Sequence, residues 1–196
     1  MSEKLNTIKI VIHGRGGMGA VTACEIIAEA AYLSGNYVDV HAYPSFGAER
    51  RGAPVQSYAK LSRTEKIWDR AQIKNPDIII IFDETVLNQQ IASSLKKEGI
   101  IIVNSDKDPD HFKTKFNLSN SNKIIVANIN KLSLEKDATI DGNPVVNTPI
   151  LGMLSKALPD LSLENLKKVI NKRMSEKIAK LNIELIEEGY RLAKMS

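Results

Sequence analysis

The sequence predicts an α/β fold, with a wound, mostly parallel sheet, helices on both faces and a helical C-terminal tail. Short apolar runs without alternation, such as residues 78–82, are typical of strands that are covered on both faces. Stretches with helical spacing separate these runs. After residue 143 the pattern changes to helices alone. We therefore expect a single unit over 1–196, an α/β body over 1–143 with a helical extension over 144–196 packed on it.

The first part of the body predicts three strands and one helix. Residues 7–12 are rich in β-branched side chains and lead into glycines, which indicates a buried first strand. Residues 20–33 keep a helical apolar face, and Ser34-Gly35-Asn36 ends it. Residues 37–43 and 55–61 alternate apolar with polar side chains, so we expect two further strands, the second of them toward the sheet edge.

The second part of the body predicts strands covered by helices. The apolar run at 78–82 is followed by a helical pattern over 85–97, and residues 99–103 and 123–127 indicate two more buried strands. Residues 106–122, between those two strands, are rich in Asn, Lys and Ser. We expect this segment to be a surface excursion.

The tail predicts three helices. Thr148 can cap a helix and Pro149 suits the first helical position, so a helix is expected from 149 to 158. Further helices are expected at 163–173 and 176–194. The last of these carries four apolar residues on one face: Ile178, Leu181, Leu185 and Ile186.

Composition excludes several classes of protein. The net charge is +4, but Lys and Arg are interspersed with Asp and Glu, and aromatic residues are 5% of the chain, so we expect no nucleic-acid partner. The apolar runs are far shorter than the roughly 20 residues of a membrane span, and residues 1–9 do not resemble a leader. Cys24 is the single cysteine, which excludes an intrachain disulfide and an iron–sulfur site. We expect a cytoplasmic protein without a membrane partner.

A glycine-rich run over residues 13–20 joins the first strand to the first helix. Such a turn collects backbone N–H groups and the positive end of a helix dipole. Gly14, Gly16 and Gly19 have the spacing of a dinucleotide-binding fingerprint. That fingerprint also needs an acidic residue at the end of the second strand, and Asp39 is expected in mid-strand. The glycines therefore either permit close strand–helix packing or seat an anion or a partner's loop.

A second run over residues 44–54 is dense in glycine, arginine and proline and follows the next strand. The adjacent Arg50 and Arg51 could form a solvated loop, or could offer planar forks to a carboxylate or phosphate. Because both runs are expected at the carboxyl ends of neighbouring strands, we expect them to face one crevice. The candidate binding residues are Gly14, Arg15, Gly16, Gly17, Gly19, Arg50 and Arg51.

Other polar residues predict no catalytic constellation. Asp83-Glu84 follows the central strand, where Asp more often caps the next helix than forms a catalytic pair. Cys24 is expected to be packed inside the first helix. No nucleophile–base pair is recognisable, and the histidines have no spacing that indicates a metal site: His13, His41 and His111.

The two runs together resemble the gamma subunit of the 2-oxoacid:ferredoxin oxidoreductases, the pyruvate and ketoisovalerate ferredoxin oxidoreductase family. Pro76-Asp77 before the central strand and residues 145–152 (VVNTPILG) add to the resemblance. Met18 stands where the family usually has Gln. Asp141-Gly142-Asn143 is too closely spaced for a thiamine diphosphate magnesium motif, so we expect a turn there.

The resemblance implies a role inside a larger enzyme. In such enzymes a 2-oxoacid is oxidatively decarboxylated with coenzyme A, and ferredoxin is reduced. Thiamine diphosphate and magnesium lie between the alpha and beta subunits, and iron–sulfur clusters lie in the beta and delta parts. The gamma part is structural, so its partners are the alpha, beta and delta subunits, and the candidate residues would contact coenzyme A or a subunit. The isolated chain is expected to be inactive.

Three alternatives remain from the sequence alone. A free-standing NAD(P) oxidoreductase would bind a nucleotide as the isolated protein. An autonomous interaction domain would bind partners other than thiamine-dependent subunits. An indolepyruvate oxidoreductase beta subunit would share the fold but is expected to differ in the loop over residues 46–52. The identity of the 2-oxoacid is not encoded in this chain if the substrate pocket lies in other subunits.

Overall fold

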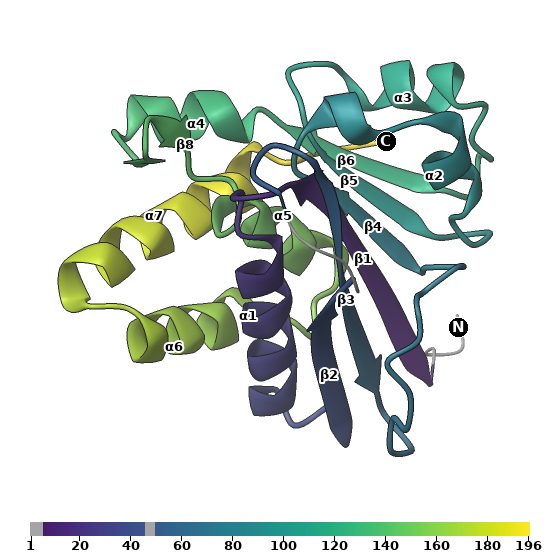
Figure 1. Cartoon of the computed structure of the whole chain (residues 1–196), viewed down its shortest axis with the longest axis horizontal. Coiled ribbons are helices and arrows are strands. Elements are labelled where there is room, and N and C mark those ends of the chain that lie inside the picture. Colours follow the sequence, from purple (N-terminus) through teal and green to yellow (C-terminus); the bar gives the residue numbers. More distant parts are fainter. Residues whose placement is uncertain (1–5, 46–49) are drawn as a thin grey trace.

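The computed structural model describes residues 6–45 and 50–196, and its centre is a mixed sheet (Figure 1). The sheet has the strand order β2-β3-β1-β4-β5-β6-β9. Its strands are β1 (Thr7–Arg15), β2 (Asp39–Pro44), β3 (Pro54–Ser62), β4 (Ile78–Ile81), β5 (Ile100–Asn104), β6 (Lys123–Ala127) and β9 (Lys194–Met195).

Most strands run in one direction, as the sequence predicts. The parallel neighbours are β1 with β4, β4 with β5, and β5 with β6. Strand β3 lies antiparallel between β1 and β2, so β2 runs in the direction of β1. Short strand β9 is antiparallel to β6. The α/β class with a mostly parallel sheet is therefore confirmed, although β1 and β2 are not direct neighbours.

Helices cover both faces of the sheet, and the predicted helical tail is present. The first face packs against α1 (Ala20–Leu33), α4 (Ile129–Glu135), α5 (Pro149–Ala157), α6 (Leu163–Arg173) and α7 (Glu176–Leu192). The opposite face packs against the short helices η1 (Glu84–Val86), α2 (Gln89–Ser93) and α3 (Pro109–Lys115). None of the helices in the described part of the chain is long and apolar enough to span a bilayer.

Two glycines bring α5 and α7 into backbone contact. A Cβ on Gly152 would lie 2.0 Å from the carbonyl oxygen of Ile186, and one on Gly189 would lie 2.1 Å from that of Pro149. Both positions therefore need glycine, because a methyl group would overlap the other helix. The two glycines explain how the last helix lies so close to the body.

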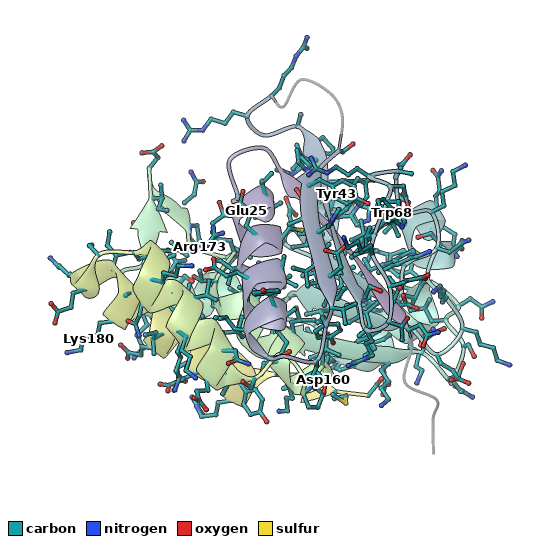
Figure 2. All side chains as sticks on the ribbon, turned by 90° about the horizontal axis from the view of Figure 1, so that it is seen from below. Glu25, Tyr43, Trp68, Asp160, Arg173 and Lys180 are labelled. Carbon is teal, nitrogen blue, oxygen red and sulfur yellow. The ribbon has the colours of Figure 1, made fainter. Side chains whose placement is uncertain are left out.

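Ion pairs fix the tail to the first helix. Arg173 of α6 donates to Glu29 at 2.7 Å and to Glu25 at 2.8 Å, both on α1, and Lys172 donates to Glu29 at 2.6 Å. Figure 2 shows Arg173 beside Glu25 between the tail and α1. These bonds lower the pKa of Glu29, so its carboxylate stays ionised at neutral pH.

Several predicted boundaries are wrong for local reasons. The helix expected over 85–97 is divided into η1 and α2, because Leu87 is extended and Asn88 caps a new helix through Ile91 N–H. The excursion over 106–122 contains α3, whose Phe112 is buried. The last helix ends at Leu192, before β9.

An irregular segment over residues 63–76, which we call the strap, covers the face of β1 to β3 that is turned away from α1. Lys60 of β3 forms an ion pair with Asp69 of the strap at 2.5 Å, and Tyr43 donates to the carbonyl oxygen of Ala71 at 2.9 Å. Figure 2 shows Tyr43 and Trp68 on this side of the sheet. Polar tethers therefore hold the strap, and Trp68 remains 86% exposed.

Candidate functional site

The glycine run and the arginine run meet at the carboxyl end of β1. Strand β3 lies between β1 and β2, so the predicted neighbouring of those strands is wrong, but the arginine run leads directly into β3 beside the glycines. Gly16 N–H donates to Ala53 at 2.8 Å, and Gly52 N–H donates to Gly16 at 3.0 Å. A Cβ on Gly16 would lie 2.3 Å from the Arg50 carbonyl oxygen, so glycine is required for this contact.

Some of the hydrogen-bonding groups of the glycine loop are paired with one another. Gly14 is still inside β1, opposite Val55 of β3. Met18 N–H donates to the Arg15 carbonyl at 3.0 Å, and Arg15 N–H donates to the Met18 sulfur at 3.4 Å. The residue that departs from the family pattern therefore closes the turn through its thioether.

The N–H groups in the first turn of α1 have no acceptor within the helix. Gly17 and Gly19 have φ values of +94° and +78°, which favour glycine, and Gly19 occupies the N-cap position. No side chain among the described residues caps this helix, and its first turn contains no acidic residue. The positive end of the α1 dipole is therefore available to an anion.

Arg15 joins three chain segments. Its guanidinium donates to Asp83 at 2.6 Å, to the Thr85 hydroxyl at 2.6 Å and to the Gly52 carbonyl at 3.0 Å. This predicted site residue is thus engaged in holding the glycine loop to the end of β4 and to the arginine run. Its guanidinium is already neutralised by Asp83.

Asp83 caps the helix that follows β4, as predicted. Its carboxylate accepts from the Thr85 N–H at 2.9 Å and from the Thr85 hydroxyl at 2.7 Å. Burial raises its pKa, but the hydrogen bonds from Thr85 and Arg15 outweigh burial and hold the pKa below its usual value. Glu84 also has a lowered pKa, because Lys107 and Ser105 donate to it. Neither carboxyl group is suited to deliver a proton at neutral pH.

Arg51 lies over the glycine loop and meets the chain that precedes the tail. Its guanidinium donates to Asp141 at 2.7 Å, and both side chains are mostly exposed. Asp141 and Gly142 form the two-residue turn between β7 (Thr139–Ile140) and β8 (Asn143–Pro144), which confirms the predicted turn. Arg50 is exposed, and Glu49 of the same run lies outside the described residues.

Asn147 is a member of this site that sequence analysis did not select. A Cβ on Gly19 would lie 2.6 Å from the Asn147 amide nitrogen, so the asparagine lies directly against the N-terminus of α1. The sequence feature that could have indicated Asn147 is the run over residues 145–152. That run was recognised as part of the resemblance without any assigned contact.

The remaining candidates lie away from the glycine loop or are inert. Asp39 opens β2 rather than lying in mid-strand, and it accepts from Ile67 N–H of the strap at 2.7 Å. It is therefore at the wrong end of β2 to hold a ribose at the glycine loop. Cys24 is buried in α1, and burial raises its thiol pKa. Within the described ranges, no three His, Cys, Asp or Glu side chains are grouped to hold a metal ion.

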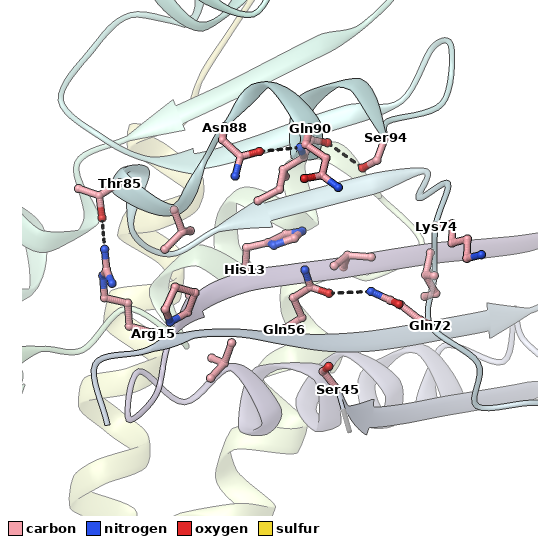
Figure 3. A pocket seen from close by; sticks show the side chains of 17 residues that line it. His13, Arg15, Ser45, Gln56, Gln72, Lys74, Thr85, Asn88, Gln90 and Ser94 are labelled. Atoms are coloured by element: carbon pink, nitrogen blue, oxygen red, sulfur yellow. Dashed lines mark hydrogen bonds between the residues drawn. The ribbon is translucent and has the colours of Figure 1, made fainter. Parts of the chain in front are cut away.

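A cavity of about 900 Å³ lies between the strap, α2 and the sheet, and its lining includes Gly14 and Arg15 of the candidate site (Figure 3). His13 of β1, for which the sequence indicates no metal site, lies in its lining. Burial lowers the pKa of His13 to about 4, so its imidazole is neutral at physiological pH.

Comparison with known proteins identifies the family. The family model of pyruvate ferredoxin/flavodoxin oxidoreductases matches residues 9–192. The chain belongs to this family. It is 36% identical over 184 residues to the "pyruvate/ketoisovalerate oxidoreductases common subunit gamma" of Pyrococcus furiosus, which covers 93% of this chain and 95% of that subunit. The resemblance predicted from the glycine and arginine runs is therefore confirmed.

Solved structures show the same fold. The pyruvate oxidoreductase subunit PORC of Thermotoga maritima superposes with a TM-score of 0.82 at 32% identity, covering 98% of this chain and 99% of that one. The 2-oxoglutarate:ferredoxin oxidoreductase from Magnetococcus marinus, with 2-oxoglutarate, coenzyme A and succinyl-CoA bound, gives 0.74 at 20% identity. That match covers 96% of this chain but 31% of the other, so it shows that the family fold also occurs as part of a longer chain.

Proposed function

We propose that this chain is the non-catalytic gamma subunit of a thiamine-diphosphate-dependent 2-oxoacid:ferredoxin oxidoreductase. The enzyme would oxidatively decarboxylate pyruvate or a similar 2-oxoacid to an acyl-CoA and reduce ferredoxin. The observation that carries the proposal is the match to a gamma subunit over nearly the full length of both chains. We treat the chain as a single gamma-type unit, in which residues 144–196 pack on the α/β body, in a cytoplasmic complex.

The protonation state of the two carboxyl groups after β4 supports a non-catalytic role. Asp83 and Glu84 have lowered pKa values and are engaged by Arg15 and Lys107, so they are not poised as acids or bases. The single cysteine cannot hold a cluster. Thiamine diphosphate, magnesium and iron–sulfur clusters would therefore reside in the alpha, beta and delta subunits, with ferredoxin as the acceptor.

The glycine and arginine runs are proposed to hold an anion for that complex. The uncapped N-terminus of α1 offers N–H groups, and Arg50 and Arg51 supply positive charge next to it. The Arg51–Asp141 pair is exposed, so it is weak and can be exchanged for another carboxylate or a phosphate. The ligand is either a phosphate group of coenzyme A or an acidic loop of the alpha or beta subunit. Gly14, Arg15 and Gly16 would shape this site, whereas Gly17 and Gly19 would face the ligand.

The test replaces both arginines in the reconstituted complex. If coenzyme A is the ligand, Arg50→Ala with Arg51→Ala should raise the KM for coenzyme A and leave the 2-oxoacid KM unchanged. A lost charge-assisted contact is worth about 1.5–3 kcal/mol, so the KM should rise roughly ten- to a hundred-fold. If a subunit is the ligand, the variant should fail to co-purify with its partners. Arg191→Ala, at an exposed arginine of α7, is the matched control. Normal assembly with an unchanged KM would reject both versions.

A further inference from the structure

Trp68 is the most exposed large apolar side chain among the described residues. It is 86% exposed, and it is the single tryptophan of the chain. One exposed apolar side chain needs no explanation by itself. Tryptophan, however, is among the residue types that most often dominate the binding energy of a protein interface. The surroundings of Trp68 therefore decide whether it marks one.

The indole lies beside the free edge of the sheet, next to a second exposed apolar side chain. Strand β2 is the edge strand, and Val38, immediately before it, is 61% exposed. The Ile67 N–H of the strap donates to the Asp39 carboxylate of β2 at 2.7 Å. Because these two residues adjoin Trp68 and Val38 in the chain, both apolar side chains can contact the same partner.

The backbone that carries the indole is held on both sides. Ile67 is bonded to Asp39, and the Asp69 carboxylate accepts from the Lys60 ammonium of β3 at 2.5 Å. The position of Trp68 relative to β2 and β3 is therefore set before a partner arrives. A preformed anchor loses less conformational entropy on binding than a disordered one.

Basic side chains flank the indole on the strap. The Lys66 ammonium lies 6.0 Å from the centroid of the indole ring, and Arg70 follows two residues after the indole. Both are exposed, as is Lys74, and none of the three forms an ion pair with a described residue. Of the two acidic residues of the strap, Asp69 is already paired, which leaves Glu65. The strap therefore carries net positive charge beside its apolar centre.

An acidic protein surface fits these features better than other partners. A strand of nucleic acid is bound by several aromatic rings on which successive bases stack, and the strap presents one ring. A bilayer surface attracts larger clusters of basic residues or an amphipathic helix, and residues 66–74 form no helix. In a symmetric pair of copies of this chain, the same basic side chains would face each other and repel.

We propose that the strap around Trp68, with Val38 beside it, is a docking surface for an acidic face of another subunit of the complex. Trp68 and Val38 supply the apolar centre of the contact, and Lys66 and Arg70 oppose carboxylates at its rim. The inference rests on the proposed subunit role. It assigns a contact surface at the edge of the sheet that the glycine and arginine runs do not include.

The single tryptophan allows a direct test by fluorine NMR of the full chain labelled with fluorotryptophan. In the isolated chain, the one fluorine resonance should shift when water is replaced by heavy water, because Trp68 is exposed. Addition of unlabelled alpha, beta and delta subunits should move the resonance and abolish this solvent shift. A complex that assembles while Trp68 keeps its solvent shift would overturn the proposal and leave the proposed function standing. A chain that joins no complex would overturn both.

Substitution of the indole measures the apolar centre. Trp68→Ala should keep the fold, because the side chain is exposed, and should weaken binding of the chain to the other subunits by about thirty-fold. Ile178→Ala, at a 54% exposed residue of α7, is the control and should leave the affinity unchanged. Unchanged affinity in Trp68→Ala would overturn the proposal. So would a fluorine resonance that moves as the isolated chain is concentrated, because a second copy would then cover Trp68.

Charge reversal measures the basic rim. Lys66→Glu with Arg70→Glu should slow association with the other subunits, most clearly at low salt. Lys177→Glu with Lys180→Glu, at two exposed lysines of α7, changes the net charge equally and should have a much smaller effect. Equal effects of the two double variants, or no effect of either, would show that the partner surface is not acidic and would overturn the proposal.

Discussion

The two faces of the sheet are stabilised in different ways. On the α1 face, helices from both ends of the chain share one continuous apolar cluster with the strands. On the other side of β1 to β3, the strap covers a small cluster of Val11, Tyr43, Tyr58 and Ile73, and leaves a cavity next to it. The first face therefore carries most of the apolar stabilisation, whereas on the second face polar groups line an open cavity.

The strap is held to the sheet by polar contacts that are partly exposed to solvent. Burial lowers the pKa of Lys60, but the bonds to Asp69 and Tyr43 outweigh burial, so the pKa rises. Its partner Asp69 is 65% exposed, which weakens the ion pair in solution. A segment held in this way should open locally at lower free energy than the helices across the sheet.

On the helical face, a substitution between α5 and α7 should destabilise the protein most. Gly152→Ala places a methyl group 2.0 Å from the Ile186 carbonyl and 2.6 Å from Tyr190 N, so α5 and α7 must separate. We expect a loss of about 4 kcal/mol in the free energy of unfolding, measured by urea denaturation. Gly35→Ala, where a Cβ would meet no atom within 4 Å, is the control. It should cost about 1 kcal/mol because of its positive φ. Equal losses would contradict close α5–α7 packing.

On the cavity face, the stability of the fold should depend on pH through His13. Burial lowers the pKa of His13 from 6.5 to about 4. Between these two pH values the imidazole is protonated in the unfolded chain but not in the folded chain. Stability should therefore fall as the pH falls from about 6.5 toward 4, by about 2 kcal/mol between pH 7 and pH 5. In His13→Gln this fall of about 2 kcal/mol in the free energy of unfolding should disappear. In His111→Gln, at an exposed position of α3, the fall should remain. An unchanged pH profile in His13→Gln would show that the imidazole is not buried.

The smallest effect concerns the strap itself. Asp69→Asn removes the negative charge that pairs with Lys60. The free energy of local unfolding of the strap should fall by only about 1 kcal/mol, because Asp69 is largely exposed. Hydrogen exchange of strap amides over residues 63–76 should become faster, while exchange in α5 and α7 stays unchanged. Glu65→Gln, on the same segment and without an ion pair among the described residues, is the control. Acceleration in the helices as well would mean that the two faces unfold together.

Sequence patterns could predict what depends on local periodicity and turn chemistry. The apolar run of β4, the Asp83 cap and the Asp141-Gly142 turn all follow from short segments, and all are confirmed. Helix α4 was missed because its seven residues give a weak periodic signal, although Asn128 caps it. Strand β9 was missed because two residues carry no strand pattern and pair only through the tertiary fold.

The candidate site was predictable in outline only. The meeting of the glycine and arginine runs was expected, but the reason given was wrong, because the strand order places β3 between β1 and β2. The engagement of Arg15 by Asp83 joins residues 68 positions apart, and the contact of Asn147 with Gly19 spans a still longer separation. Such pairings depend on the tertiary arrangement and have no local signature.

We propose that this chain supports catalysis in a complex without performing it. The most direct measurement is 2-oxoacid-dependent reduction of a viologen dye by the isolated full chain, compared with a complex rebuilt from the alpha, beta, gamma and delta subunits. We expect a colourless isolated chain without activity, and dye reduction by the rebuilt complex. Dye reduction by the isolated chain, or iron bound to it, would show that this chain carries a catalytic or redox centre of its own.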